Sequence, residues 1–224
     1  MLYLVGGAAR SGKSTVAQRF VVQTVIPYFC LDYLMMGFAN GAPSFGVNPE
    51  DDELQVATLL TPVIRSMAVA MLENGEEYLL EGVQLHPRLA AELCREFPGQ
   101  VRVCFLGYAE ADLNTKMHQI RHLNGGTNDW LRDYDDGQLL TTVARLQHLS
   151  ATVQGECIRH GLPYFETAVH FERVVDEVVT FLRTGSASPM SSPRRQDESA
   201  RSMPARNRPI QSRGLEVFSN TALL

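Results

Sequence analysis

Residues 1–15, MLYLVGGAARSGKST, decide what fold can follow. They satisfy the spacing G-x-x-x-x-G-K-[ST] at Gly7, Gly12, Lys13 and Ser14. A glycine-rich turn of this kind directs successive backbone N–H groups inward as a nest for anions, and the positive end of the following helix adds to it. The lysine then reaches the β and γ phosphates of a nucleotide, and the serine hydroxyl is offered to Mg²⁺. The predicted phosphate-binding residues are Gly7, Ala8, Ala9, Arg10, Ser11, Gly12, Lys13, Ser14 and Thr15.

The pattern on either side of the turn agrees with this interpretation. Residues 2–5 are typical of a buried strand and residues 14–22 of a helix. Further along, short apolar runs alternate with helical periodicity, which predicts an α/β fold with a five-stranded parallel sheet and helices on both faces. Ligands of such sheets bind at the carboxyl ends of the strands. The other predicted strands are 27–31, 78–82, 101–106 and 163–166, and the other predicted helices are 48–74, 86–97, 110–123, 137–160 and 170–182.

One helix start carries a specific prediction. In the stretch NPEDDEL, Asn48 is placed to cap a helix, Pro49 takes the first helical position, and acidic residues fill the first turn. We therefore expect a helix that begins at Asn48 and ends near Asn74, where Gly75 stops it.

Composition and charge divide the chain into two parts. With 224 residues, 45% of them hydrophobic, the chain can bury one sizeable core or two small ones, and its formal net charge of −5 argues against a general nucleic-acid binder. From residue 184 onward the balance reverses to six arginines against three acidic residues, in a segment rich in Ser and Pro with no apolar period. We expect a folded domain over 1–183 and a disordered tail over 184–224, with a basic docking segment as the alternative for the tail.

The amino-acid composition also indicates in which cellular compartment the protein works and what it binds. The four cysteines form no C-x-x-C pair and resemble reduced core residues, and the six histidines show no metal-ligand spacing that would indicate zinc. No apolar run in the sequence suggests a membrane span, and the first residues lack the basic flank of a signal peptide. The expectation is a cytoplasmic protein whose partner is a small-molecule phosphate acceptor, with neither nucleic acid nor membrane among its partners.

The kind of phosphate chemistry follows from what accompanies the P-loop. The GTPase motifs D-x-x-G and N-K-x-D do not occur, nor does an LSGGQ-type signature, and motor-type ATPases need a longer chain. A small P-loop kinase with a helical lid fits best. Its expected parts, in chain order, are Asp32 after the second strand, the helix 48–74 with Arg65, Glu81 at the end of the third strand, and a lid over 112–133.

Each candidate residue has a chemical role and a plainer alternative. Asp32 would accept the proton of the attacking hydroxyl, or would cap the apolar stretch that follows it. Glu81 would hold Mg²⁺ through a water together with Ser14, or would cap the next turn. Arg121 and Arg132 would stabilise the transferred phosphoryl group, or would lie on a solvated helix face. Arg10 is a phosphate contact or a side chain projecting into solvent.

Four stretches carry a resemblance to a known group. GGAARSGKST, CLDYL, YLLEGVQLHP and LQHLSATVQGECIRHGLPYFE resemble the small P-loop kinases grouped around 2-phosphoglycerate kinase and, more distantly, chloramphenicol phosphotransferase and the zeta-toxin kinases. The resemblance implies transfer of the γ-phosphoryl group of ATP, with Mg²⁺, to a hydroxyl of a 2-phosphoglycerate-like acid. It also implies a lid with two arginines in the pattern R-x-x-x-R. At that place this sequence has KMHQIRHL, whose basic residues, histidines aside, are only Lys116 and Arg121. The alternative is a regulatory module that binds ATP, hydrolyses it slowly and docks through its tail.

Overall fold

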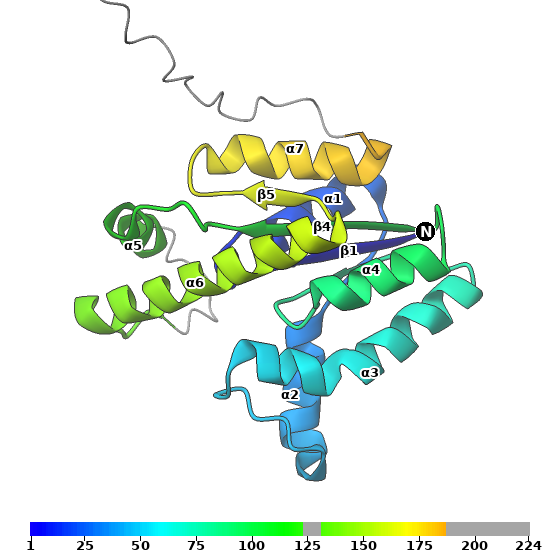
Figure 1. Ribbon diagram of the computed structural model, residues 1–224, viewed down its shortest axis with the longest axis horizontal. Coiled ribbons are helices and arrows are strands. Elements are labelled where there is room, and N and C mark those ends of the chain that lie inside the picture. Colours follow the sequence, from blue (N-terminus) through cyan, green and yellow to red (C-terminus); the bar gives the residue numbers. More distant parts are fainter. Residues whose placement is uncertain (123–130, 187–224) are drawn as a thin grey trace, which may run out of the picture. The chain divides into compact units, whose positions relative to one another are not determined.

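The computed structural model describes residues 1–122 and 131–186 (Figure 1). Five parallel strands form one sheet in the order β2-β3-β1-β4-β5, which confirms the predicted sheet. The strands are β1 (Leu2–Gly7), β2 (Tyr28–Cys30), β3 (Tyr78–Glu81), β4 (Val101–Gly107) and β5 (Tyr164–Glu166). Residues 187–224 of the predicted tail and residues 123–130 of the predicted lid lie outside the described residues.

Helices cover both faces of the sheet, as expected (Figure 1). On one face α1 and α7 pack on the sheet through apolar residues such as Phe20 and Val178, and on the other face α3, α4 and α6 do so through residues such as Ile64, Leu93 and Val153. The helices are α1 (Lys13–Thr24), α2 (Leu31–Gly41), α3 (Glu53–Glu73), α4 (Pro87–Glu96), α5 (Leu113–His122), α6 (Asp136–His160) and α7 (Phe171–Thr184), with a 3₁₀ turn η1 (Pro43–Phe45).

The strand register brings three chain segments to one edge of the sheet. Val5 of β1 pairs with Glu81 of β3, and Glu81 pairs with Cys30 of β2. Cys30 and Glu81 are the last residues of their strands, and Val5 lies two residues before the end of β1, so the segments that follow the three strands open onto the same edge. The loop after β1, the end of β3 and the first turn of α2 therefore meet there.

The start of α3 differs from the prediction. The helix begins at Glu53 and is capped by Asp52, whose Oδ1 accepts from the N–H groups of Leu54 and Gln55 at 2.9 and 3.3 Å. Asn48 instead accepts from the N–H of Glu50 at 3.1 Å within a turn, so the cap and the first helical residue both lie four residues later than predicted. Several residues of the stretch NPEDDEL can cap a helix, and spacing alone does not choose among them.

Helix α3 is also the most apolar long helix among the described residues. By length and composition alone it could cross a membrane. Apart from the adjacent Val56 and Ala57, its buried positions recur every three or four residues, which is the pattern of a helix that packs one face on the core of the domain. These positions are Val56, Ala57, Leu60, Ile64, Ala68 and Leu72.

Helix α1 ends in a strained residue, which yields a stability prediction. Val25 has φ 63° and donates its N–H to Val21 O at 2.8 Å, while its side chain is 86% exposed. A left-handed conformation costs a β-branched residue about 1–2 kcal/mol, and this position usually holds glycine. We expect Val25→Gly to raise the free energy of unfolding by about 1 kcal/mol in urea titrations.

A matched control is Val22→Gly in the interior of the same helix. Its side chain is similarly exposed, at 84%. Glycine there should lower the free energy of unfolding by about 0.5 kcal/mol, because glycine has a lower helix propensity than valine. Equal destabilisation by the two substitutions would contradict the assignment of strain to Val25.

Candidate active site

The loop over residues 8–12 joins β1 to α1 and depends on its two flanking glycines. Gly7 has φ 125°, and a Cβ there would lie 1.8 Å from the carbonyl oxygen of Leu106. Gly12 has φ 100°, and a Cβ there would lie 2.7 Å from the ring of Phe171. Only glycine permits both the backbone conformation and the close approach. The spacing that the motif prescribes is thus explained by the geometry of the loop.

Lys13 lies along this loop. Its Nζ donates to the carbonyl oxygen of Ala8 at 2.8 Å, and the side chain is 7% exposed. Burial lowers the pKa of Lys13, and the nearby charges of Glu81 and Asp32 oppose that shift. A cation is therefore held beside the loop and near both acidic side chains of the site.

Ser14 and Glu81 form an oxygen pair at the start of α1. The Ser14 hydroxyl donates to Oε1 of Glu81 at 3.0 Å, and Glu81 is 2% exposed. The carboxylate thus contacts Ser14 across the sheet edge, and their joint binding of Mg²⁺ stays a prediction. A hydroxyl and a carboxylate are ligands that suit Mg²⁺.

The buried polar groups of the loop also fit a phosphate. Ser11 is fully buried, and its Oγ has no hydrogen-bond partner within residues 1–122 and 131–186. A buried hydroxyl left without a partner is costly, so a ligand that bonds to it would be favoured. The chemistry of the loop, Lys13 and the Ser14–Glu81 pair fits a nucleotide with its Mg²⁺.

Asp32 lies in the first turn of α2, one residue inside the helix. The N-cap is Cys30, and Oδ1 of Asp32 accepts from Nε2 of Gln84 at 2.8 Å. The plainer alternative, in which Asp32 caps the helix, is therefore wrong. Burial raises the pKa of the neighbouring Cys30 thiol to about 12, with Glu81 and Asp32 adding to the shift, so this thiol stays neutral beside the carboxylates.

Gln84 is a site residue that sequence reasoning missed. It follows β3 by three residues, is fully buried, and its Oε1 has no hydrogen-bond partner in the described part of the chain. Its position just beyond the carboxyl end of a strand, in the stretch LEGVQ, is the one signal that could have identified it.

Arg121 of the predicted lid and Arg65 of helix α3 make structural contacts. Arg121 donates to the carbonyl oxygen of Tyr134 at 2.6 Å and to Oδ1 of Asp136 at 3.1 Å, so it ties α5 to the start of α6. Arg132 is exposed in the turn before α6. Arg65 pairs with Glu96 of α4 at 2.5 Å. A catalytic role for Arg121 remains a prediction.

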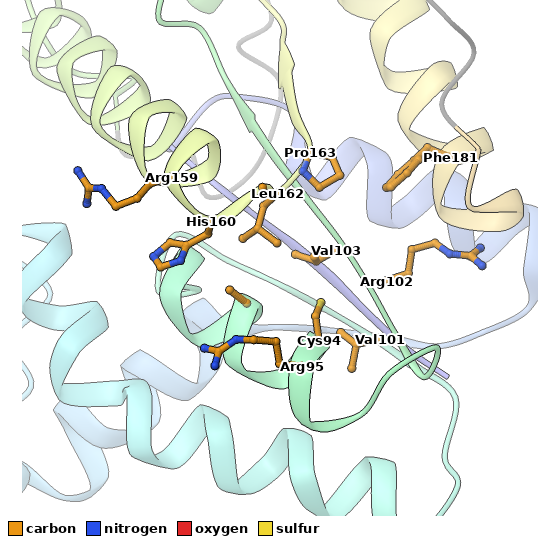
Figure 2. Close-up of a pocket in the computed structure, with 12 residues that line it drawn as sticks. Cys94, Arg95, Val101, Arg102, Val103, Arg159, His160, Leu162, Pro163 and Phe181 are labelled. Atoms are coloured by element: carbon orange, nitrogen blue, oxygen red, sulfur yellow. The ribbon is translucent and has the colours of Figure 1, made fainter.

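A cavity of about 480 Å³ lies at the opposite edge of the sheet, beside Val101 at the start of β4 and Pro163 just before β5 (Figure 2). Figure 2 shows Arg102 and Arg159 directed to opposite sides of it. Arg102 donates to the carbonyl oxygen of Leu182 at 2.5 Å, and Arg159 pairs with Glu156. Because the cavity lies at the amino ends of β4 and β5, whereas the loop follows the carboxyl end of β1, the cavity does not form part of the phosphate site.

Comparisons with known proteins bear on the fold. No protein-family model matches the chain, and no curated protein matches it. Among solved structures, shikimate kinase from Bacteroides thetaiotaomicron covers 82% of this chain and 98% of its own, with a TM-score of 0.51 and 14% identity. The chain has a P-loop NTPase fold. The match to a gluconokinase from Sinorhizobium meliloti 1021 covers 81% of this chain and 90% of the gluconokinase chain, with a TM-score of 0.48 and 18% identity.

The site yields a prediction for Lys13. Lys13→Ala removes the cation beside the loop, so we expect nucleotide binding to weaken at least about tenfold and ATP turnover to fall by about 10² or more, with a nearly unchanged melting temperature. The control is Arg19→Ala, which removes another α1 cation that pairs with Glu172 and Asp176 of α7. Turnover near the parental rate in Lys13→Ala would contradict the phosphate-binding role.

Proposed function

We propose that the protein is a kinase that transfers the γ-phosphoryl group of ATP to a hydroxyl of a small molecule. The observation that carries this proposal is the meeting of three groups at one sheet edge: Lys13 with its loop, the Ser14–Glu81 pair, and the Asp32–Gln84 pair. Phosphoryl transfer needs a phosphate cradle, a metal site and an acceptor-side base, and these three groups can supply them. The fold shared with shikimate kinase is consistent with this chemistry.

Each residue has one task in this proposal. Backbone N–H groups of the loop and Lys13 bind the phosphates, and Ser14 and Glu81 would hold Mg²⁺, which neutralises charge on the phosphoryl oxygens when bound. Asp32 receives the proton of the acceptor hydroxyl and orients that hydroxyl. Gln84 fixes the Asp32 carboxylate through its 2.8 Å hydrogen bond, while its free Oε1 can accept from a second hydroxyl of the acceptor.

The proposed acceptor is a small hydroxy acid resembling 2-phosphoglycerate. The chain motifs support this choice, and so does an ion pair between α6 and α3. Arg145 of α6 pairs with Glu53 at the start of α3, and the charges of both residues act on Tyr108, whose hydroxyl contacts the loop at Ala9. A half-exposed guanidinium in this place could exchange Glu53 for a carboxylate or phosphate of the acceptor.

The function is tested by ADP release with ATP, Mg²⁺ and a panel of hydroxy acids and their phosphates, together with neutral polyols. ADP release that requires a hydroxy acid supports the acceptor class. We also expect Arg145→Met to raise the KM for that acid. Release that is equally fast without any acceptor would instead favour the regulatory module that hydrolyses ATP slowly.

Asp32→Asn provides the sharpest test of mechanism. The amide cannot take a proton, so we expect phosphoryl transfer to fall by about 10² to 10⁴ while ATP affinity and melting temperature stay near the parental values. Asp176→Asn, an acid on α7 at the other face of the sheet, is the matched control. An Asp32→Asn protein that phosphorylates its acceptor at the parental rate would remove Asp32 from the mechanism.

A further inference from the structure

A second buried lysine contacts the phosphate-binding loop from outside. Lys116 belongs to α5 and is 4% exposed. Its Nζ donates to the carbonyl oxygen of Arg10 at 3.1 Å and lies 4.2 Å from the ring centroid of Tyr108. A lysine is rarely buried to this extent without a partner, and both of these contacts lie at the loop. The mechanism proposed above does not use this residue.

Tyr108 makes the neighbouring contact. It follows β4 directly, is fully buried, and donates its hydroxyl to the carbonyl oxygen of Ala9 at 3.0 Å. Two consecutive carbonyl oxygens of the loop, those of Ala9 and Arg10, thus accept hydrogen bonds from Tyr108, just after β4, and from Lys116 of α5. The loop backbone here is strained, since Arg10 has φ 62° without being glycine.

The hydrogen bonds to these two carbonyl oxygens also fix the direction in which the N–H groups of the loop point. In a planar trans peptide the C=O and N–H groups point in opposite directions. Fixing the oxygens of Ala9 and Arg10 therefore orients the N–H groups of Arg10 and Ser11 away from Lys116 and Tyr108. A hydrogen bond from a charged ammonium polarises the peptide, which makes the N–H at its other end a better donor to an anion.

We propose that Lys116 is a positioning residue of the phosphate-binding loop, which with Tyr108 holds the Ala9 and Arg10 peptides in the orientation that binds a polyphosphate. This inference rests on the proposed binding of nucleotide at the loop. It gives α5, which forms part of the predicted lid over 112–133, a direct contact with that loop.

Several charged groups surround Lys116. Burial lowers the pKa of Lys116 to about 8; Glu166 at the end of β5 opposes this shift, and Arg10 of the loop adds to it. Burial raises the pKa of Tyr108, on whose ring Lys116 lies, so its hydroxyl stays protonated, and Arg145 of α6 acts on this tyrosine. Lys116 is thus mostly charged at pH 7 and mostly neutral at pH 9.5.

Nucleotide binding should therefore depend on the protonation of Lys116. A bound polyphosphate favours the charged ammonium, so the contribution of Lys116 to affinity is present below pH 8 and is lost as the pH rises above it. Lys13 also has a lowered pKa. The ratio of variant to parental Kd at each pH cancels the titration of Lys13 and isolates Lys116.

The test is calorimetric titration of the full chain with ADP and Mg²⁺ at pH 7.0 and 9.5. We expect Lys116→Met to raise Kd about tenfold at pH 7.0 and to have little effect at pH 9.5. Lys116→Arg keeps its charge at both values, so it should bind more tightly than the parental protein at pH 9.5. Tyr108→Phe should raise Kd by a similar few-fold factor at both values, because its hydroxyl does not titrate in this range.

The outcomes separate this inference from the proposed function. Parental protein that binds no ADP overturns both. Parental protein that binds ADP, with Lys116→Met unchanged at pH 7.0 or equally impaired at both pH values, overturns only the role of Lys116. If Lys116→Met does not fold, Lys116→Arg decides. An arginine variant whose affinity for ADP falls between pH 7.0 and 9.5 as much as that of the parental protein would contradict the proposal.

Discussion

The pairing of Cys30, Glu81 and Val5 across three parallel strands is the constraint on which the rest of the site depends. This register places the ends of β2 and β3 beside β1, two residues before the loop that follows β1, so groups distant in the chain come within hydrogen-bond distance. A shift of one strand by a single residue would turn the buried Glu81 to the other face of the sheet and break its contact with Ser14. The apolar residues on both faces oppose such a shift, and the core therefore holds the site in place.

The second feature of the site is its buried charge. Lys13 and Lys116 are each at most 7% exposed, and each donates to a carbonyl oxygen of the same loop, at Ala8 and Arg10. Burying ammonium groups is costly, and burial lowers the pKa of both. A polyanion at the loop would offset that cost, whereas a purely structural turn would gain nothing from two buried cations. The arrangement thus favours phosphate binding on energetic grounds.

The sequence predicted what is local and missed what is long-range. The loop, the strands and most helix ends follow from short patterns, such as Gly161 after α6, which ends the helix with φ 65°. The predicted start of α3 was wrong because Asn48 and Asp52 are both residues that favour the N-cap position of a helix. The contacts of Gln84 with Asp32, Tyr108 with Ala9 and Lys116 with Arg10 span 52, 99 and 106 residues, and no local pattern encodes such pairings.

The central claim is that the site passes a phosphoryl group to a hydroxyl held at Asp32. The most direct measurement is ³¹P NMR of the full chain with ATP, Mg²⁺ and a protein-free extract of small cellular metabolites. The account predicts a phosphomonoester resonance that grows in step with ADP and fails to grow with Asp32→Asn. Conversion of ATP to ADP and inorganic phosphate alone, at the same rate in both proteins, would contradict it.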